Sequence, residues 1–185
     1  MEKLFADAKD RMQKAVEAMR REFAKVRTGK ATPGLLDGVK VEYYGSTVPL
    51  KQVANVSAPE ARLLVVHPWD KGVLGEVEKA IQSADLGLNP SNDGNLIRVP
   101  IPPLTEERRK ELVRHVHKLA EDGRIAVRNI RRDVNEELKS KQKAGEISED
   151  EFHRAHDKTV QEMTDETIHE IDHLLALKEE ELMEV

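Results

Sequence analysis

The sequence His169-Glu170-Ile171-Asp172-His173 matches the pattern H-E-x-x-H, in which two histidines bind zinc and the glutamate acts as a general base. On a helix the two histidines share one face, as metal binding requires. A hydrolytic zinc also needs a third protein ligand and a dry cleft, and the sequence indicates neither. In a helical projection the apolar residues from Val160 to Leu175 cluster on one side, whereas both histidines fall on the opposite side. We therefore predict solvent-exposed histidines on an acidic helix, and no zinc enzyme.

Other catalytic groups are poorly represented. The sequence contains no cysteine, which excludes thiol nucleophiles, disulfide frameworks and zinc ribbons. It contains no G-x-S-x-G motif, and Gly72 and Gly75 do not form a phosphate-binding loop. His67-Pro68-Trp69 follows a predicted strand, where a lone tryptophan more often packs in a core than lines a ligand site. We predict a protein without catalytic residues, cofactor or metal.

A ridge of arginines is the clearest sign of binding. Arg124, Arg128 and Arg131 are spaced by four and three residues, so they line one side of a helix with few acids between them. The planar fork of arginine suits phosphate oxygens, and several together supply affinity for folded RNA. The alternative is a solvated face laced with intrahelical ion pairs. The pattern alone leaves both interpretations open.

The net charge of −5 hides a strongly polarised chain. Residues 1–30 and 104–145 each carry a net charge of about +4, residues 31–103 about −2 and residues 146–185 about −11, counted from the sequence. Two basic stretches are therefore compatible with a nucleic-acid partner in spite of the total. Aromatic residues make up 3% of the chain, too few for a platform on which single-stranded bases stack.

Apolar spacing predicts three helices. The first runs from Leu4 to Val26, with apolar residues every three or four positions, and Gly29 and Pro33 end it. The second opens at Thr105 and ends at Gly145, and a third follows the capping-box pattern that begins at Ser148. Because no helix with a single apolar stripe is stable alone, the three should pack as a bundle.

Residues 35–103 have the pattern of a β-rich module. Short apolar stretches, some with alternating apolar and polar residues, are separated by prolines and glycines. We predict short strands at 39–43, 48–50, 53–57, 62–66 and 96–99, and one helix at 73–84. The predicted fold class is α+β: a long three-helix bundle of residues 1–29 and 105–185, with a small β/α/β domain inserted at 30–104. The chain crosses twice between them, which predicts a two-stranded hinge. The hinge residues are Thr28, Gly29, Lys30, Pro100, Pro102, Pro103 and Leu104.

Five stretches together resemble the bacterial ribosome recycling factor family, and the resemblance covers essentially the whole chain in order. They are Arg27-Thr28-Gly29-Lys30-Ala31, Val41-Glu42-Tyr43-Tyr44-Gly45, Asp85-Leu86-Gly87-Leu88-Asn89-Pro90, Pro102-Pro103-Leu104-Thr105-Glu106-Glu107-Arg108-Arg109-Lys110 and Val127-Arg128-Asn129-Ile130-Arg131-Arg132-Asp133. One departure is Lys30, where the family is expected to have arginine. Lysine keeps the charge but loses bidentate geometry.

The resemblance implies a two-domain, L-shaped protein similar in outline to tRNA. Its bundle would bind the large ribosomal subunit, and its insert would pivot and meet elongation factor G and the small subunit. Together with that GTPase, it would split the ribosome after termination and free mRNA and tRNA. Carried over by motif, Arg27, Arg109, Arg128 and Arg131 are the expected ribosomal RNA contacts. The neighbouring cations complete the predicted set: Lys110, Arg124 and Arg132.

We expect a cytoplasmic monomer, because the first residues do not form a signal peptide and no apolar run approaches a membrane span. The alternative function is a helical interaction protein, such as a chaperone-like adaptor. Such an adaptor would need an exposed apolar groove, and its binding would be insensitive to salt.

Overall fold

The computed structural model describes residues 1–184. It divides into two compact units. The first comprises Met1–Arg27 and the chain from Glu106 onward, and the second comprises Thr28–Thr105. The α+β fold class is confirmed, with a long helical region and a small sheet domain.

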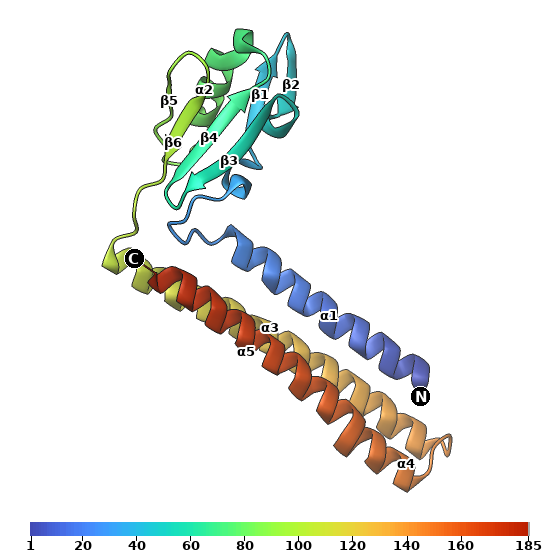
Figure 1. Ribbon diagram of the computed structural model, residues 1–185. Coiled ribbons are helices and arrows are strands. Elements are labelled where there is room, and N and C mark those ends of the chain that lie inside the picture. The colour runs from blue at the N-terminus through green and yellow to red at the C-terminus, as the bar shows by residue number, and fades with distance from the viewer. Residues whose placement is uncertain (185) are drawn as a thin grey trace. The chain divides into compact units, whose positions relative to one another are not determined.

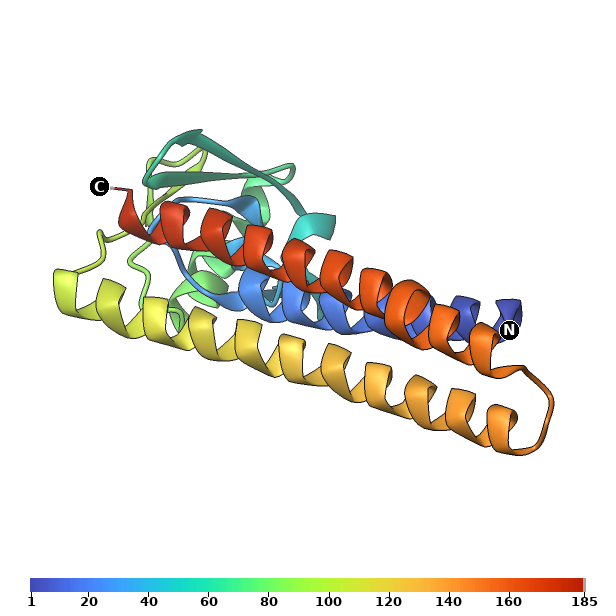
Figure 2. The ribbon, with the colours of Figure 1, turned by 90° about the horizontal axis from the view of Figure 1, so that it is seen from below.

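The first unit is a bundle of three long helical rods (Figure 1). They are α1 (Glu2–Lys25), α3 (Glu106–Lys143), and a third rod in which α4 (Glu149–His153), η4 (Arg154–Val160) and α5 (Gln161–Met183) follow one another. Figure 2 shows α1 and α5 running alongside α3. The core between them consists of fully buried apolar side chains, among them Met12, Val16, Val116, Val127, Leu138, Ile171 and Leu182.

The predicted capping box opens the third rod. The Ser148 hydroxyl accepts a hydrogen bond from the Glu151 N–H at 3.2 Å, and the Glu151 carboxylate accepts one from the Ser148 N–H at 2.8 Å. These bonds satisfy backbone donors that the first helical turn leaves unpaired. They also hold the pKa of Glu151 below its usual value. The prediction of this helix start is confirmed.

The third rod contains a π-helical stretch at η4, which the periodicity did not predict. In a π-helix the backbone hydrogen bonds join residues five positions apart, one more than in an α-helix. Ala155 and Val160, five residues apart, are both buried in the bundle. The wider turn brings both to the core, after which α5 returns to α-helical spacing with Thr164 buried.

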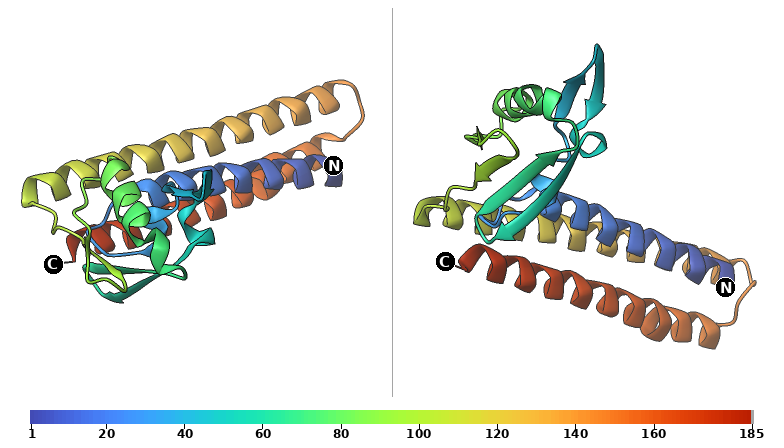
Figure 3. Two further views of the ribbon diagram at one scale, coloured as in Figure 1. Left: turned by 90° about the horizontal axis from the view of Figure 1, so that it is seen from above. Right: turned by 45° about the horizontal axis from the view of Figure 1, so that its top comes forward.

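The second unit holds a hairpin and a four-stranded antiparallel sheet (Figure 3). The hairpin pairs β1 (Lys40–Tyr43) with β2 (Ser46–Pro49). The sheet has the order β3-β4-β6-β5, where β3 is Ala54–Glu60, β4 Leu63–Pro68, β5 Ser91–Asn92 and β6 Ile97–Pro100. One helix, α2 (Leu74–Ser83), packs against β1. Three short 3₁₀ helices complete the unit: η1 (Pro33–Leu36), η2 (Leu50–Gln52) and η3 (Lys71–Val73).

Two predictions in this unit need correction. Leu50, expected in a strand, begins η2, and the two-residue strand β5 was not predicted. Trp69 was expected to pack in the core, but it is 67% exposed. Along β4 the buried side chains are Leu64, Val66 and Pro68, so strand alternation turns the next residue outward.

Two chain segments connect the bundle and the insert, and each is hydrogen-bonded to the insert. We call these segments the crossings. The Ala31 N–H donates to the Ala61 carbonyl at 2.7 Å, and the Ile101 N–H donates to the Arg62 carbonyl at 2.8 Å. Pro100 is the last residue of β6, so this residue of the predicted hinge belongs to the sheet. The crossings beyond these bonds comprise residues 28–30 and 102–105.

These short crossings lie side by side. Gly29 has a φ of +79°, and a Cβ built on it would lie 3.4 Å from the Leu104 side chain. A larger residue at Gly29 would therefore strain the backbone and press on the other crossing. None of the helices in residues 1–184 is both long and apolar enough to cross a membrane.

Candidate nucleic-acid interface

The predicted arginine ridge lies on α3, whose buried residues set its orientation. Val127, Ile130 and Val134 face the bundle core, which places the arginines between them on the flank of the helix. Arg128 is half-buried, with 39% of its side chain exposed, and Arg131 is also half-buried. Arg132 is exposed. The four arginines from 124 to 132 therefore share one stretch of α3 but differ in their surroundings.

Arg124 is part of the packing between α3 and α5. Its Nε and Nη2 donate to Oδ1 of Asp172 at 2.9 and 2.6 Å, and its Nη1 donates to Oε2 of Glu121 at 3.0 Å. The side chain is 18% exposed. Every nitrogen of its guanidinium is engaged by a carboxylate, which leaves little of Arg124 for an external phosphate.

Replacing Arg124 by alanine should lower the free energy of unfolding by about 1 kcal/mol, because the interhelical contact is lost and Asp172 is left without its partner. Urea unfolding followed by circular dichroism would measure this change. Arg132→Ala is the matched control, and it should change stability by less than about 0.5 kcal/mol. Equal destabilisation by the two substitutions would contradict a bundle role for Arg124.

Arg128 is only loosely held. Its Nη1 donates to Oε1 of Glu121 at 3.1 Å, so one carboxylate serves both Arg124 and Arg128. These hydrogen bonds, first from Arg124 and then from Arg128, lower the pKa of Glu121. Exposed pairs on one helix contribute little free energy. Arg128 can therefore exchange this contact for a phosphate at small cost.

Arg131 and Arg132 are the unpaired cations of the ridge. Among residues 1–184 neither makes an ion pair or a hydrogen bond through its guanidinium. The adjacent acid, Asp133, accepts a hydrogen bond from Arg11 of α1 at 2.6 Å and is itself neutralised. Two adjacent arginines without a carboxylate partner have the charge and the donors to bind an anion such as phosphate.

The remaining predicted contacts do not join this group. Arg109 and Lys110 lie about 30 Å from Arg131 along α3, at 1.5 Å per residue. Lys110 pairs with Glu106 at 2.8 Å, one turn away. The Arg109 side chain is half-buried, and its Nε is enclosed without a hydrogen-bond partner among the described residues. Arg27, just after α1, is exposed.

Lys118 is a cation that the predicted set missed. It is exposed and has no ion-pair partner in residues 1–184, and the same is true of Arg114. With Lys110 these residues repeat every four positions, so they form a second basic row on α3. The four-residue spacing of these cations is visible in the sequence, but the net charge of the whole segment does not reveal it.

The acids of the H-E-x-x-H sequence serve the bundle. Glu170 accepts hydrogen bonds from Arg20 at 3.1 Å and from Gln13 at 3.4 Å, both on α1, and Asp172 accepts from Arg124. His169 and His173 are exposed. Residues 1–184 contain no group of three side chains that could together hold a metal ion. The motif therefore fastens α5 to its two neighbouring helices.

Comparison with known proteins gives a consistent result. The family model described as "Ribosome recycling factor" matches residues 19–183. The ribosome-recycling factor of Bacillus licheniformis is 58% identical over 179 residues, which cover 97% of this chain and 96% of that protein. The ribosome-recycling factor of Desulforamulus reducens is 54% identical over 185 residues, the full length of both.

Two solved structures are similar across the chain. The solution structure of a ribosome recycling factor has a TM-score of 0.77 at 46% identity, and it covers 100% of this chain and 97% of the other. A second has a TM-score of 0.65 at 50% identity and covers 99% and 98%. It is a model of the Thermus thermophilus ribosome recycling factor with Escherichia coli elongation factor G on the E. coli post-termination complex. This chain belongs to the ribosome recycling factor family.

Proposed function

We propose that the chain disassembles the post-termination ribosome together with elongation factor G, and that the bundle grips ribosomal RNA of the large subunit through α3. The observation that carries this proposal is the pair Arg131 and Arg132, which has no carboxylate partner in residues 1–184 while the adjacent Asp133 is used by α1. Arg128, held by one exposed pair, joins them at the surface. Arg124 contributes indirectly, because its ion pair with Asp172 holds α3 against α5.

The mechanism we propose is mechanical and not catalytic. The bundle positions the protein on RNA, and the insert moves as a body about residues 28–30 and 102–105. The bonds from Ala31 and Ile101 to the β3–β4 turn support this division, because they attach each crossing to the insert near its end. Hydrolysis of GTP belongs to elongation factor G. The chain needs no cofactor for this work, and it acts where ribosomes act, in the cytoplasm.

Light scattering of intact ribosomes tests the proposed function. Post-termination complexes mixed with the chain, elongation factor G and GTP should lose scattering as the subunits separate. Omitting any one of the three should leave the signal unchanged. Splitting that proceeds at full rate without the GTPase, or no splitting with all three present, would overturn the proposal.

A further inference from the structure

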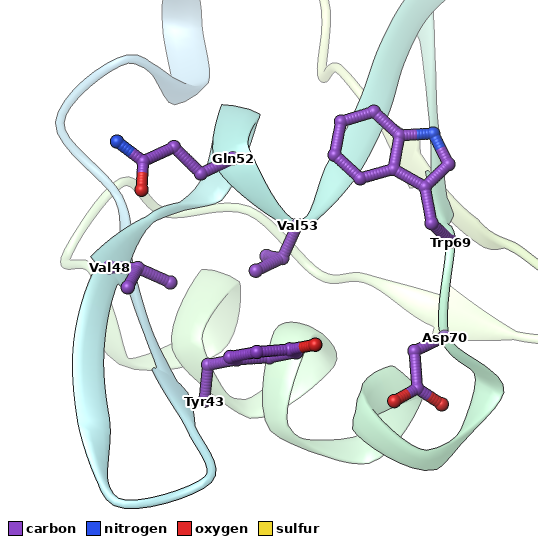
Figure 4. A pocket seen from close by; sticks show the side chains of 6 residues that line it. All are labelled: Tyr43, Val48, Gln52, Val53, Trp69 and Asp70. Carbon is purple, nitrogen blue, oxygen red and sulfur yellow. The ribbon is translucent and has the colours of Figure 1, made fainter.

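Few large apolar side chains face solvent in residues 1–184, and two of them lie within the long helices. These two are Ile125 of α3, which is 46% exposed, and Leu177 of α5, which is 45% exposed. The others lie at the chain ends or on the insert, where the exposed Trp69 borders a small pocket (Figure 4). A single exposed apolar residue is ordinary on a protein surface. The neighbours of each one therefore decide whether it has a role.

Ile125 faces away from the bundle core. It precedes the buried Val127 by two residues, which turns it about 160° from that residue around the helix axis. A β-branched residue at an exposed helical position loses side-chain freedom and gains little burial in return. Lysine, arginine or glutamate would favour the helix more at this position. Neither the packing of α3 nor its helix propensity accounts for this isoleucine.

Cations surround Ile125 on the outward side of α3. Arg128 follows it by one turn, and Lys118 and Arg132 lie two turns before and after it, each about 10 Å away along the axis. Lys118 and Arg132 are exposed and have no ion-pair partner in residues 1–184. Glu121, one turn before Ile125, is already bonded to two arginines of the ridge. The apolar side chain therefore lies among cations that are available to a partner.

These charges favour RNA over a protein as the partner that covers Ile125. The other acid within one turn is Asp122, which lies on the side of α3 toward α1 and lines a groove with Ala15 and Ala18. Asp122 therefore marks the edge of the cationic surface. Unpaired lysines and arginines attract phosphates. An apolar side chain between them meets the part of a nucleotide that carries no charge, which is its base or its ribose.

We propose that Ile125 packs on the exposed face of an unpaired nucleobase in the large-subunit ribosomal RNA. Lys118, Arg128 and Arg132 bind the phosphates on either side of that nucleotide. Phosphate contacts position a protein but carry no sequence information, whereas unpaired bases are what proteins most often read in RNA. Isoleucine is among the apolar residues that pack against bases. The inference rests on the proposed function, and it adds a contact that recognises the site instead of only attracting the chain to it.

Binding to isolated large subunits across a salt series separates this contact from the cationic ones. Ile125→Ala should weaken the affinity about fivefold at every salt concentration, because it removes buried apolar surface without changing the number of counterions released. The slope of the logarithm of affinity against the logarithm of salt concentration should stay that of the native chain. Arg132→Ala should instead lower this slope by about one. Ile125→Leu, which keeps the apolar surface, should bind within about twofold of the native chain.

Leu177→Ala is the matched control, because it truncates an apolar side chain of nearly equal exposure on the acidic rod. It should bind like the native chain. Urea unfolding should show that Ile125→Ala is no less stable than the native chain, since alanine is the better helix former at an exposed position. The affinity of Ile125→Ala for the duplex poly(A)·poly(U), which offers phosphates but no unpaired bases, should also equal the native value.

A diazirine-bearing analogue of leucine in place of Ile125 identifies what the side chain contacts. Illumination of its complex with large subunits should cross-link it to a single nucleotide of ribosomal RNA. No cross-link, or one to a ribosomal protein, would overturn the base contact. Native affinity in Ile125→Ala, or a lower salt slope in that variant, would overturn it as well. Failure of the native chain to bind large subunits is a separate result, which would remove the proposed function itself.

Discussion

Arg131→Glu should abolish subunit splitting at concentrations where the native chain saturates it. The Arg131 guanidinium has no ion-pair partner in residues 1–184, so the substitution would remove the proposed contact to phosphate and replace it with repulsion. Loss of one charge-assisted contact corresponds to about 2–3 kcal/mol, or about a 30- to 150-fold weaker affinity for the large subunit. Equilibrium binding to isolated large subunits measures the affinity, and light scattering measures the splitting.

The fold should survive this substitution, because the side chain is half-exposed and no interhelical bond depends on it. Arg154→Glu, an exposed position in η4, makes the same charge change on the acidic rod and is the matched control. It should bind and split like the native chain. Splitting that persists in Arg131→Glu at low concentration would show that the RNA surface lies elsewhere.

Deleting Pro102 and Pro103 should reduce the splitting rate about tenfold while affinity for the large subunit changes by less than about twofold. The deletion shortens one crossing by about 7 Å. Because the proposed RNA contacts all lie on the bundle side, binding should be spared, whereas the insert can no longer take up all of its positions. Splitting rate and binding affinity are measured on the same preparations.

A variant with the same number of residues distinguishes the effect of a shorter crossing from the effect of losing the stiff prolines. Replacing both prolines by serine keeps the number of residues and should retain most of the splitting rate. Equal loss of binding and splitting in the deletion variant would mean that the crossings only position the bundle. The pivot would then have no part in the reaction.

The helices could be predicted because their signals are local. Apolar residues at steps of three and four gave α1 and α3, and the Ser148 capping box gave the start of the third rod. The same reasoning could not find η4, since a π-helical turn depends on which side chains the neighbouring helices bury. Strand β5, two residues long, has too little pattern to be recognised before its partner β6 is in place.

The arginine ridge on α3 was predictable from the sequence, but the different surroundings of its arginines were not. The spacing of Arg124, Arg128 and Arg131 placed all three on one ridge. The partner that sets Arg124 apart, Asp172, is 48 residues away, and nothing in the spacing joins them. Strand alternation places Trp69 outward, whereas the general tendency of a lone tryptophan to pack in a core predicts the opposite.

The binding of the chain to isolated large subunits across a salt series tests the central claim most directly. If α3 docks on ribosomal phosphates, the logarithm of the affinity should fall linearly with the logarithm of salt concentration. Arg131→Ala should lower the slope by about one, the share of a single phosphate contact. An affinity that stays constant with salt, or no association at low ionic strength, would contradict the account.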